Sequence, residues 1–80
     1  MADSRTYRWR KATDINREYA LFELLEDDNP VLDVGFTDEG LFEVTFNPSI
    51  GGKVMEWDQF LSLLAEGRAL ASGSVQAAWR

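Results

Sequence analysis

One stretch decides the fold: residues 32–46 read LDVGFTDEGLFEVTF. On either side of residues 38–40, apolar side chains alternate with polar or small ones, which is the period-2 pattern of two half-buried strands. A two-residue loop would place Phe36 opposite Glu43 and set the two apolar faces against each other, whereas a three-residue loop places Phe36 opposite Phe42. The sequence therefore predicts an antiparallel hairpin with a three-residue loop whose glycine is left-handed. The expected pairs are Leu32–Phe46, Val34–Val44 and Phe36–Phe42.

Downstream of the hairpin, the sequence predicts a turn, a short strand and a helix. Residues 47–52 contain Pro, Ser and a Gly-Gly pair, which favour turns, and residues 53–56 are interpreted as a further short strand. The helix is expected to begin around Trp57-Asp58, because a carboxylate favours a helix N-terminus. Gly67 marks its expected end, since glycine is the usual residue just after a helix. Continuation of this helix to Ser72 is the alternative.

Upstream of the hairpin, the sequence predicts a strand followed by a helix. In residues 6–11, Tyr7 and Trp9 point to one side, and Thr6, Arg8 and Arg10 point to the other. This alternation indicates a short strand with its aromatic residues at the core edge and its arginines in solvent. A helix is expected to begin at Thr13 or Asp14, both good N-cap residues, because the apolar residues that follow recur at spacings of three and four. It has to end before Pro30.

These elements predict an α+β domain. An antiparallel, hairpin-centred sheet of three or four strands packs against two helices, in the order β-α-β-β-(β)-α. The domain is expected to span residues 6–71, with a frayed N-terminus at residues 1–5 and a flexible tail at residues 72–80 that carries Trp79. A chain of 80 residues buries only about 60% of the surface that it exposes when unfolded, so a partner or self-association could supplement its stability.

Charge is distributed unevenly along the chain. Residues 1–20 have a net charge of +2, and residues 21–80 have a net charge of −8. An acidic body repels phosphate, so nucleic-acid binding is not expected outside the N-terminal segment, where the candidates are Tyr7, Arg8, Trp9, Arg10 and Lys11. A cationic protein, or one whose site normally holds nucleic acid, is the better-matched partner.

The composition excludes the common catalytic chemistries. The chain has no cysteine and no histidine, which removes disulfides, thiol nucleophiles, Cys-ligated zinc and Ser-His-Asp triads. Asp33 and Glu43 lie on the polar side of the hairpin, where we expect solvated carboxylates and not an acid–base pair. Asp27 and Asp28 lack the ligand spacing of a calcium loop. We therefore expect no enzyme, no metal and no cofactor.

The acidic residues around the hairpin are the candidate partner-binding surface. Carboxylates follow the first predicted helix, line the polar side of the hairpin and flank its turn, so they could form one continuous negative surface. The predicted set is Glu26, Asp27, Asp28, Asp33, Asp38, Glu39 and Glu43. The run at residues 26–28 falls at the predicted end of a helix, where the dipole disfavours negative charge, and such inconsistencies sometimes mark functional sites.

The chain resembles small bacterial immunity-type proteins. The resemblance runs from Leu21 to Leu70, through LFELLEDDNPVLDVGFTDEGLFEVTF and WDQFLSLLAEG, and covers about fifty of the 80 residues. Immunity proteins bind and block a toxin produced by the same or a neighbouring cell. The resemblance thus implies a protein-binding inhibitor whose partner is a toxin or nuclease, and it transfers no individual functional residue.

Two function classes follow from these observations. The leading hypothesis is a small acidic inhibitor that presents its negative surface to a cationic protein. A phage-borne inhibitor of host defence would bind through the same electrostatic attraction, so the sequence does not distinguish the two. The alternative is a structural or assembly module that forms a homodimer through a sheet edge or its aromatic termini. No segment has the pattern of a signal peptide or a membrane span, so we expect a cytoplasmic protein and no membrane partner.

Overall fold

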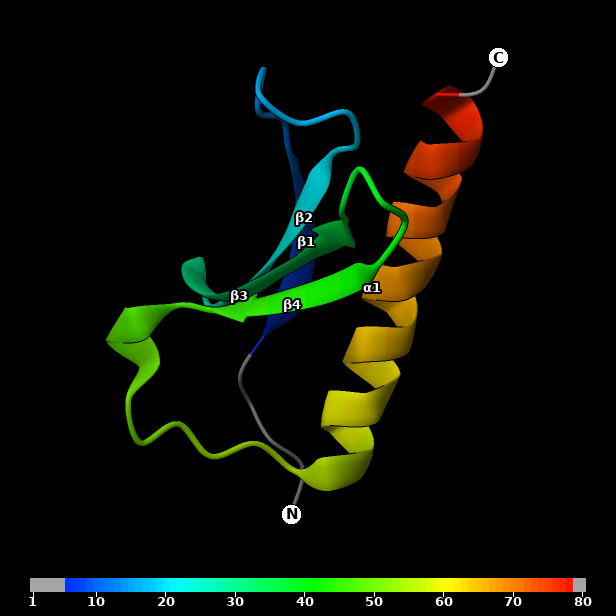
Figure 1. Cartoon of the computed structure of the whole chain (residues 1–80). Helices are drawn as coiled ribbons and strands as arrows, with labels where there is room; N and C mark the ends of the chain where they lie inside the picture. Colours follow the sequence, from blue (N-terminus) through cyan, green and yellow to red (C-terminus); the bar gives the residue numbers. More distant parts are fainter. Residues whose placement is uncertain (1–5, 79–80) are drawn as a thin grey trace.

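A four-stranded antiparallel sheet and one long helix make up the described part of the chain, which in this computed structural model is residues 6–78 (Figure 1). The strands follow one another across the sheet in chain order, each paired with the next. The elements are β1 (Tyr7–Ala12), β2 (Leu21–Glu26), β3 (Asn29–Phe36), β4 (Phe42–Phe46), a 3-10 turn (Pro48–Ile50) and α1 (Trp57–Ala78). The α+β class and an antiparallel sheet of three or four strands are therefore confirmed. The predicted order β-α-β-β-(β)-α with two helices is wrong, because four strands precede a single α-helix in the described chain.

The β3–β4 hairpin has the predicted register. Its cross-strand neighbours include Leu32 with Phe46, Val34 with Val44 and Phe36 with Phe42. The Phe36 and Phe42 rings lie 5.2 Å apart, centroid to centroid, and Gly40 has a φ of 89°, as the three-residue loop requires. Agreement between the two apolar faces was sufficient to set this register.

The helix predicted to begin at residue 13 or 14 is wrong, because residues 21–26 form the strand β2. Phe22 and Leu24 point to the side that α1 covers, where they are buried. Asp27 and Asp28 have φ values of 48° and 70°, so they form a two-residue hairpin turn with both central residues left-handed. Pro30 is accommodated because Leu24 pairs with Leu32 and Leu25 with Pro30, a bulge at which the missing N–H is tolerated.

α1 begins at Trp57 as predicted, but the expected end at Gly67 is wrong, and so is the alternative at Ser72. The helix continues to Ala78, so most of the predicted tail is helical, while Trp79 and residues 1–5 lie outside the described residues. Gly67 is buried inside the helix, where a Cβ would lie 2.6 Å from the Trp9 ring. Residues 53–56, predicted as a strand, form an unpaired linker.

The core lies between the sheet and α1. Its buried members are Phe22, Leu24, Val31, Leu32, Val34, Leu63 and Ala71. Tyr7 and Trp9 pack against its edge while Arg8 and Arg10 are exposed, as the alternation in β1 predicted. In the part of the chain that the structure describes, α1 is the only α-helix, so no helix covers the opposite side of the sheet, which we call the open face. α1 is not apolar enough to span a membrane.

Candidate functional site

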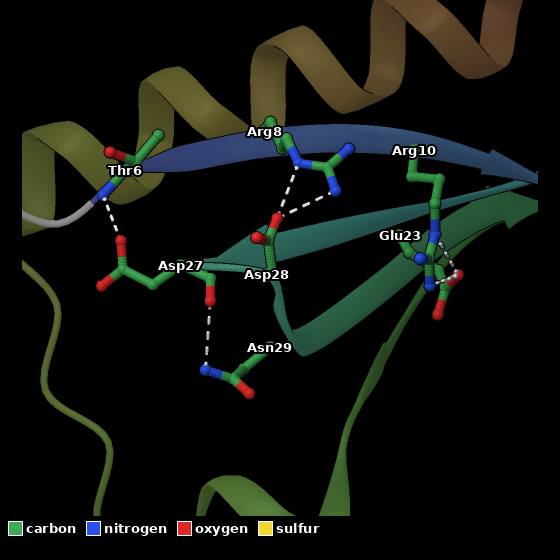
Figure 2. Close-up of polar contacts among 7 residues, drawn as sticks. All are labelled: Thr6, Arg8, Arg10, Glu23, Asp27, Asp28 and Asn29. Atoms are coloured by element: carbon green, nitrogen blue, oxygen red, sulfur yellow. Dashed lines mark hydrogen bonds and ion pairs between the residues drawn. The ribbon is translucent and has the colours of Figure 1, made fainter.

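A row of polar side chains crosses the open face, one from each strand. The register places Arg10 opposite Glu23, Glu23 opposite Asp33, and Asp33 opposite Thr45. Arg10 Nη2 lies 2.9 Å from Glu23 Oε1 (Figure 2). Glu23 and Asp33, however, are like charges directly opposite each other, which destabilises a sheet. The row therefore changes from basic at β1 to acidic at β3.

Asp33 is the most perturbed carboxyl in this row. Burial raises its pKa above the usual value of 3.8, and the neighbouring charge of Glu23 raises it further. The charge of Arg17 and a hydrogen bond from the Thr45 side chain act in the opposite direction. The ionised form of Asp33 is therefore held at a cost in free energy that a further cation on the open face would reduce.

Arg17 reaches the open face from the segment between β1 and β2. Its Nη2 donates a 3.0 Å hydrogen bond to the Phe36 carbonyl oxygen. It passes across Gly35, where a Cβ would lie 3.3 Å from Arg17 Nη2 and 2.8 Å from Leu21 Cδ2. The absent side chain at Gly35 thus makes room for Arg17, whose charge lowers the pKa of Asp33.

Four of the seven predicted residues gather on the β3–β4 hairpin. Glu43 lies on the open face opposite Gly35, and Asp38 and Glu39 form the adjoining turn with Gly40. Asp38 Oδ1 accepts a hydrogen bond from the Glu18 backbone N–H at 3.4 Å. None of the four forms an ion pair with another described residue. We call this set the hairpin acidic group: Asp33, Asp38, Glu39 and Glu43.

The other three predicted residues lie at the opposite end of β3 and have partners within the chain. Asp27 Oδ1 accepts a 2.9 Å hydrogen bond from the Thr6 backbone N–H, and Asp28 Oδ1 lies 2.9 Å from Arg8 Nη2 (Figure 2). Glu26 forms an ion pair with Lys53, and the Tyr7 hydroxyl donates a 2.7 Å hydrogen bond to the same carboxylate. The structure therefore does not bring all seven residues together, because the two groups lie towards opposite ends of β3.

Sequence reasoning missed the residues that the first hairpin supplies to the open face. Glu23 and Arg17 were both placed in a predicted helix, which gave them no defined position relative to Asp33. The available signal was the order Glu-Asp-Asp-Asn-Pro at residues 26–30, because adjacent Asp and Asn residues tolerate the left-handed conformation that a tight hairpin needs.

The register separates the two carboxylates on the polar side of the hairpin. Asp33 and Glu43 are not cross-strand neighbours, since Asp33 faces Thr45 and Glu43 faces Gly35. Among residues 6–78, no three carboxylates are grouped closely enough to hold a metal ion. Comparisons with protein-family models, curated proteins and solved structures find no match to this chain, so the immunity-type resemblance stays a prediction.

Proposed function

We propose that this protein is a non-catalytic inhibitor of the immunity type, which binds a cationic surface of a protein partner through its hairpin acidic group. The observation that carries the proposal is the unequal compensation of charge along β3. At one end, Asp28 and Glu26 form ion pairs with Arg8 and Lys53. At the other end, four carboxylates have no ion-pair partner in the described chain. A toxin or nuclease with a basic site is the partner class that fits.

The energetics favour a partner that places lysine or arginine against Asp33 and Glu43. The Glu23–Asp33 pair is repulsive within the free protein, and burial raises the pKa of the Asp33 carboxyl. A cation brought to this position by a partner relieves the repulsion and gains a Coulomb interaction at the same time. Complementary potential of this kind also accelerates association, and the acceleration falls as salt screens it.

The proposal is tested with an arginine-rich peptide as the probe. Binding is measured by fluorescence anisotropy for the wild type and for two double variants that remove the same charge: E39Q/E43Q in the hairpin acidic group, and D58N/E66Q on α1. Exposed ion pairs are worth roughly 0.2–1 kcal/mol each, so the hairpin variant should bind about two- to thirty-fold more weakly. The α1 variant should retain wild-type affinity.

The comparison between the two variants decides the outcome. A loss confined to E39Q/E43Q, and reduced at high salt, supports a localised binding surface. An equal loss in both variants contradicts it, because the peptide would then respond only to net charge. Circular dichroism of both variants confirms that neither change has disturbed the fold.

A further inference from the structure

The two edges of the sheet differ in how they are protected against pairing. β1 carries Arg8, Arg10 and Lys11, and basic side chains discourage a second strand from adding to an edge. β4 carries a single charge, Glu43, in five residues that otherwise read Phe, Val, Thr and Phe. β4 is therefore the edge at which another strand can pair.

The backbone of β4 presents a regular set of unused groups at this edge. Thr37 N–H donates to the Leu41 carbonyl at 2.8 Å, and Asn47 N–H donates to the Val31 carbonyl at 2.9 Å. Because partners alternate along an antiparallel ladder, the odd-numbered residues of β4 face β3 and the even-numbered ones face away from it. The backbone groups of Phe42, Val44 and Phe46 therefore point outward, to the side of β4 on which the described sheet has no further strand.

Apolar side chains border the same edge. Phe46 is 56% exposed at the end of β4. On α1, the Arg68 guanidinium lies 5.8 Å from the centroid of the Phe42 ring, which shows that this side of the helix faces β4. Trp57 and Leu61 share that side, at spacings of four and seven residues from one another and from Arg68, and are 68% and 44% exposed. The unpaired edge thus continues into an uncovered apolar strip.

We infer that β4 is a self-association edge, at which β4 of a second copy of this chain pairs antiparallel about a two-fold axis at Val44. This register places Phe42 opposite Phe46 of the second copy, Val44 opposite Val44, and Glu43 opposite Thr45. All three outward-facing residues then form hydrogen-bonded pairs, and each pair exchanges two hydrogen bonds. Apolar residues meet apolar ones on the α1 side, and no like charges meet on the open face.

The two neighbouring registers pair the β4 strands less favourably. An axis at Glu43 sets two glutamates directly opposite each other at the close, non-hydrogen-bonded spacing, which is destabilising. An axis at Thr45 places Phe42 opposite Pro48, which has no N–H to donate. β4 is thus self-complementary in one register, which identifies a second copy as its occupant. This inference does not depend on the proposed binding of a cationic partner.

Engineered cysteines test both the interface and its register, because the natural chain contains none. In the proposed register, residues 43 and 45 of opposite copies form a non-hydrogen-bonded pair about 4.5 Å apart at Cα, within the range that a disulfide spans. A mixture of Glu43→Cys and Thr45→Cys proteins should therefore crosslink readily on oxidation. Each variant alone places its cysteines on a diagonal about 7–8 Å apart, so each should crosslink more slowly. Glu66→Cys is the control: residue 66 is exposed on α1, so its crosslinking rate measures random collision between copies.

Sedimentation of the cysteine-free chain provides the second measurement. The wild type should show a concentration-dependent shift from 9.1 kDa towards twice that mass, and Phe46→Lys, which adds a charge at the exposed end of β4, should remain monomeric. Crosslinking of the mixture at the Glu66→Cys rate, or a wild type that stays monomeric at all concentrations, overturns the inference. Fastest crosslinking by Glu43→Cys alone or by Thr45→Cys alone overturns the register.

Discussion

Gly67→Ala should destabilise the protein, although replacing glycine by alanine inside a helix usually has the opposite effect. Gly67 lies inside α1, and replacing an interior helical glycine by alanine normally stabilises a helix by about 1 kcal/mol. Here the added Cβ would lie 2.6 Å from both Cη2 and Cζ2 of Trp9 and 3.2 Å from its Cε2. Because carbon atoms in contact are separated by about 3.5–4.0 Å, either the indole or the helix has to move.

The magnitude follows from two opposing terms. The gain in helix propensity is about 1 kcal/mol, and inserting a methyl group into a packed core costs typically about 1–3 kcal/mol. A contact as short as 2.6 Å against a rigid ring belongs at the upper end of that range. Gly67→Ala should therefore lower the free energy of unfolding by about 1–2 kcal/mol, or lower the Tm by about 4–8 °C for each kcal/mol in a domain of this size.

Urea denaturation followed by far-ultraviolet circular dichroism measures the effect, with Gly73→Ala as the matched control. Gly73 lies in the same helix, and a Cβ there would meet nothing within 4 Å, so its replacement should stabilise the protein by about 0.5–1 kcal/mol. In a Trp9→Phe background, where the ring is smaller, Gly67→Ala should cost less than it does in the wild type. Stabilisation by Gly67→Ala equal to that by Gly73→Ala would refute the packing of β1 against α1 through Trp9.

Two further predictions concern the β3–β4 hairpin. Gly40→Val should lower the free energy of unfolding by about 1–2 kcal/mol. Gly40 has a φ of 89°, and a Cβ there would meet no atom within 4 Å, so the cost comes from the backbone conformation and not from a clash. Gly51 has a negative φ and equally open surroundings, so Gly51→Val should show little change, and equal losses in the two variants would argue against a backbone cause. Asp33→Asn should stabilise the protein at neutral pH by roughly 0.2–1 kcal/mol, because burial and then Glu23 raise the pKa of that carboxyl. The folded wild type holds the proton after the unfolded chain has released it, so its stability falls as pH rises above 3.8. The advantage of the asparagine variant should disappear towards that pH in urea titrations, and a less stable variant at neutral pH would show that Arg17 and Thr45 outweigh burial.

The second hairpin was predictable because its signal is local and redundant. The alternation on both sides of residues 38–40 and the position of Gly40 each favour the same register, and a change of one residue in the loop would have placed Phe36 opposite Glu43. β2 had no such redundancy. Its LFELLE sequence is equally compatible with a helix, since leucine and glutamate have high helix propensity, and pairing with β1 and β3 decided the outcome. Ile15, counted as part of a helical apolar stripe, is fully exposed.

The end of α1 was not predictable for a different reason. Glycine after a helical apolar pattern usually marks the helix end, and nothing near Gly67 in the sequence indicates otherwise. The reason for glycine there is the close approach of Trp9, which is 58 positions earlier in the chain. Contacts between residues so distant in sequence do not affect the local hydrophobic pattern. Only the folded structure therefore distinguishes a glycine that ends a helix from one that makes room for an aromatic ring.

The acidic run at residues 26–28 was interpreted as a functional feature, but its carboxylates have partners within the protein. At the end of a helix these carboxylates would be misplaced, and that apparent conflict favoured a functional interpretation. In the hairpin turn the conflict disappears, because Asp27 and Asp28 adopt left-handed conformations, Asp27 accepts the Thr6 N–H, and Asp28 forms an ion pair with Arg8. Their charge is used within the fold. In the hairpin acidic group, Asp38 accepts the Glu18 N–H and Asp33 accepts a hydrogen bond from Thr45, but none of the four carboxylates forms an ion pair with another described residue. This uncompensated charge is what we propose that a partner binds.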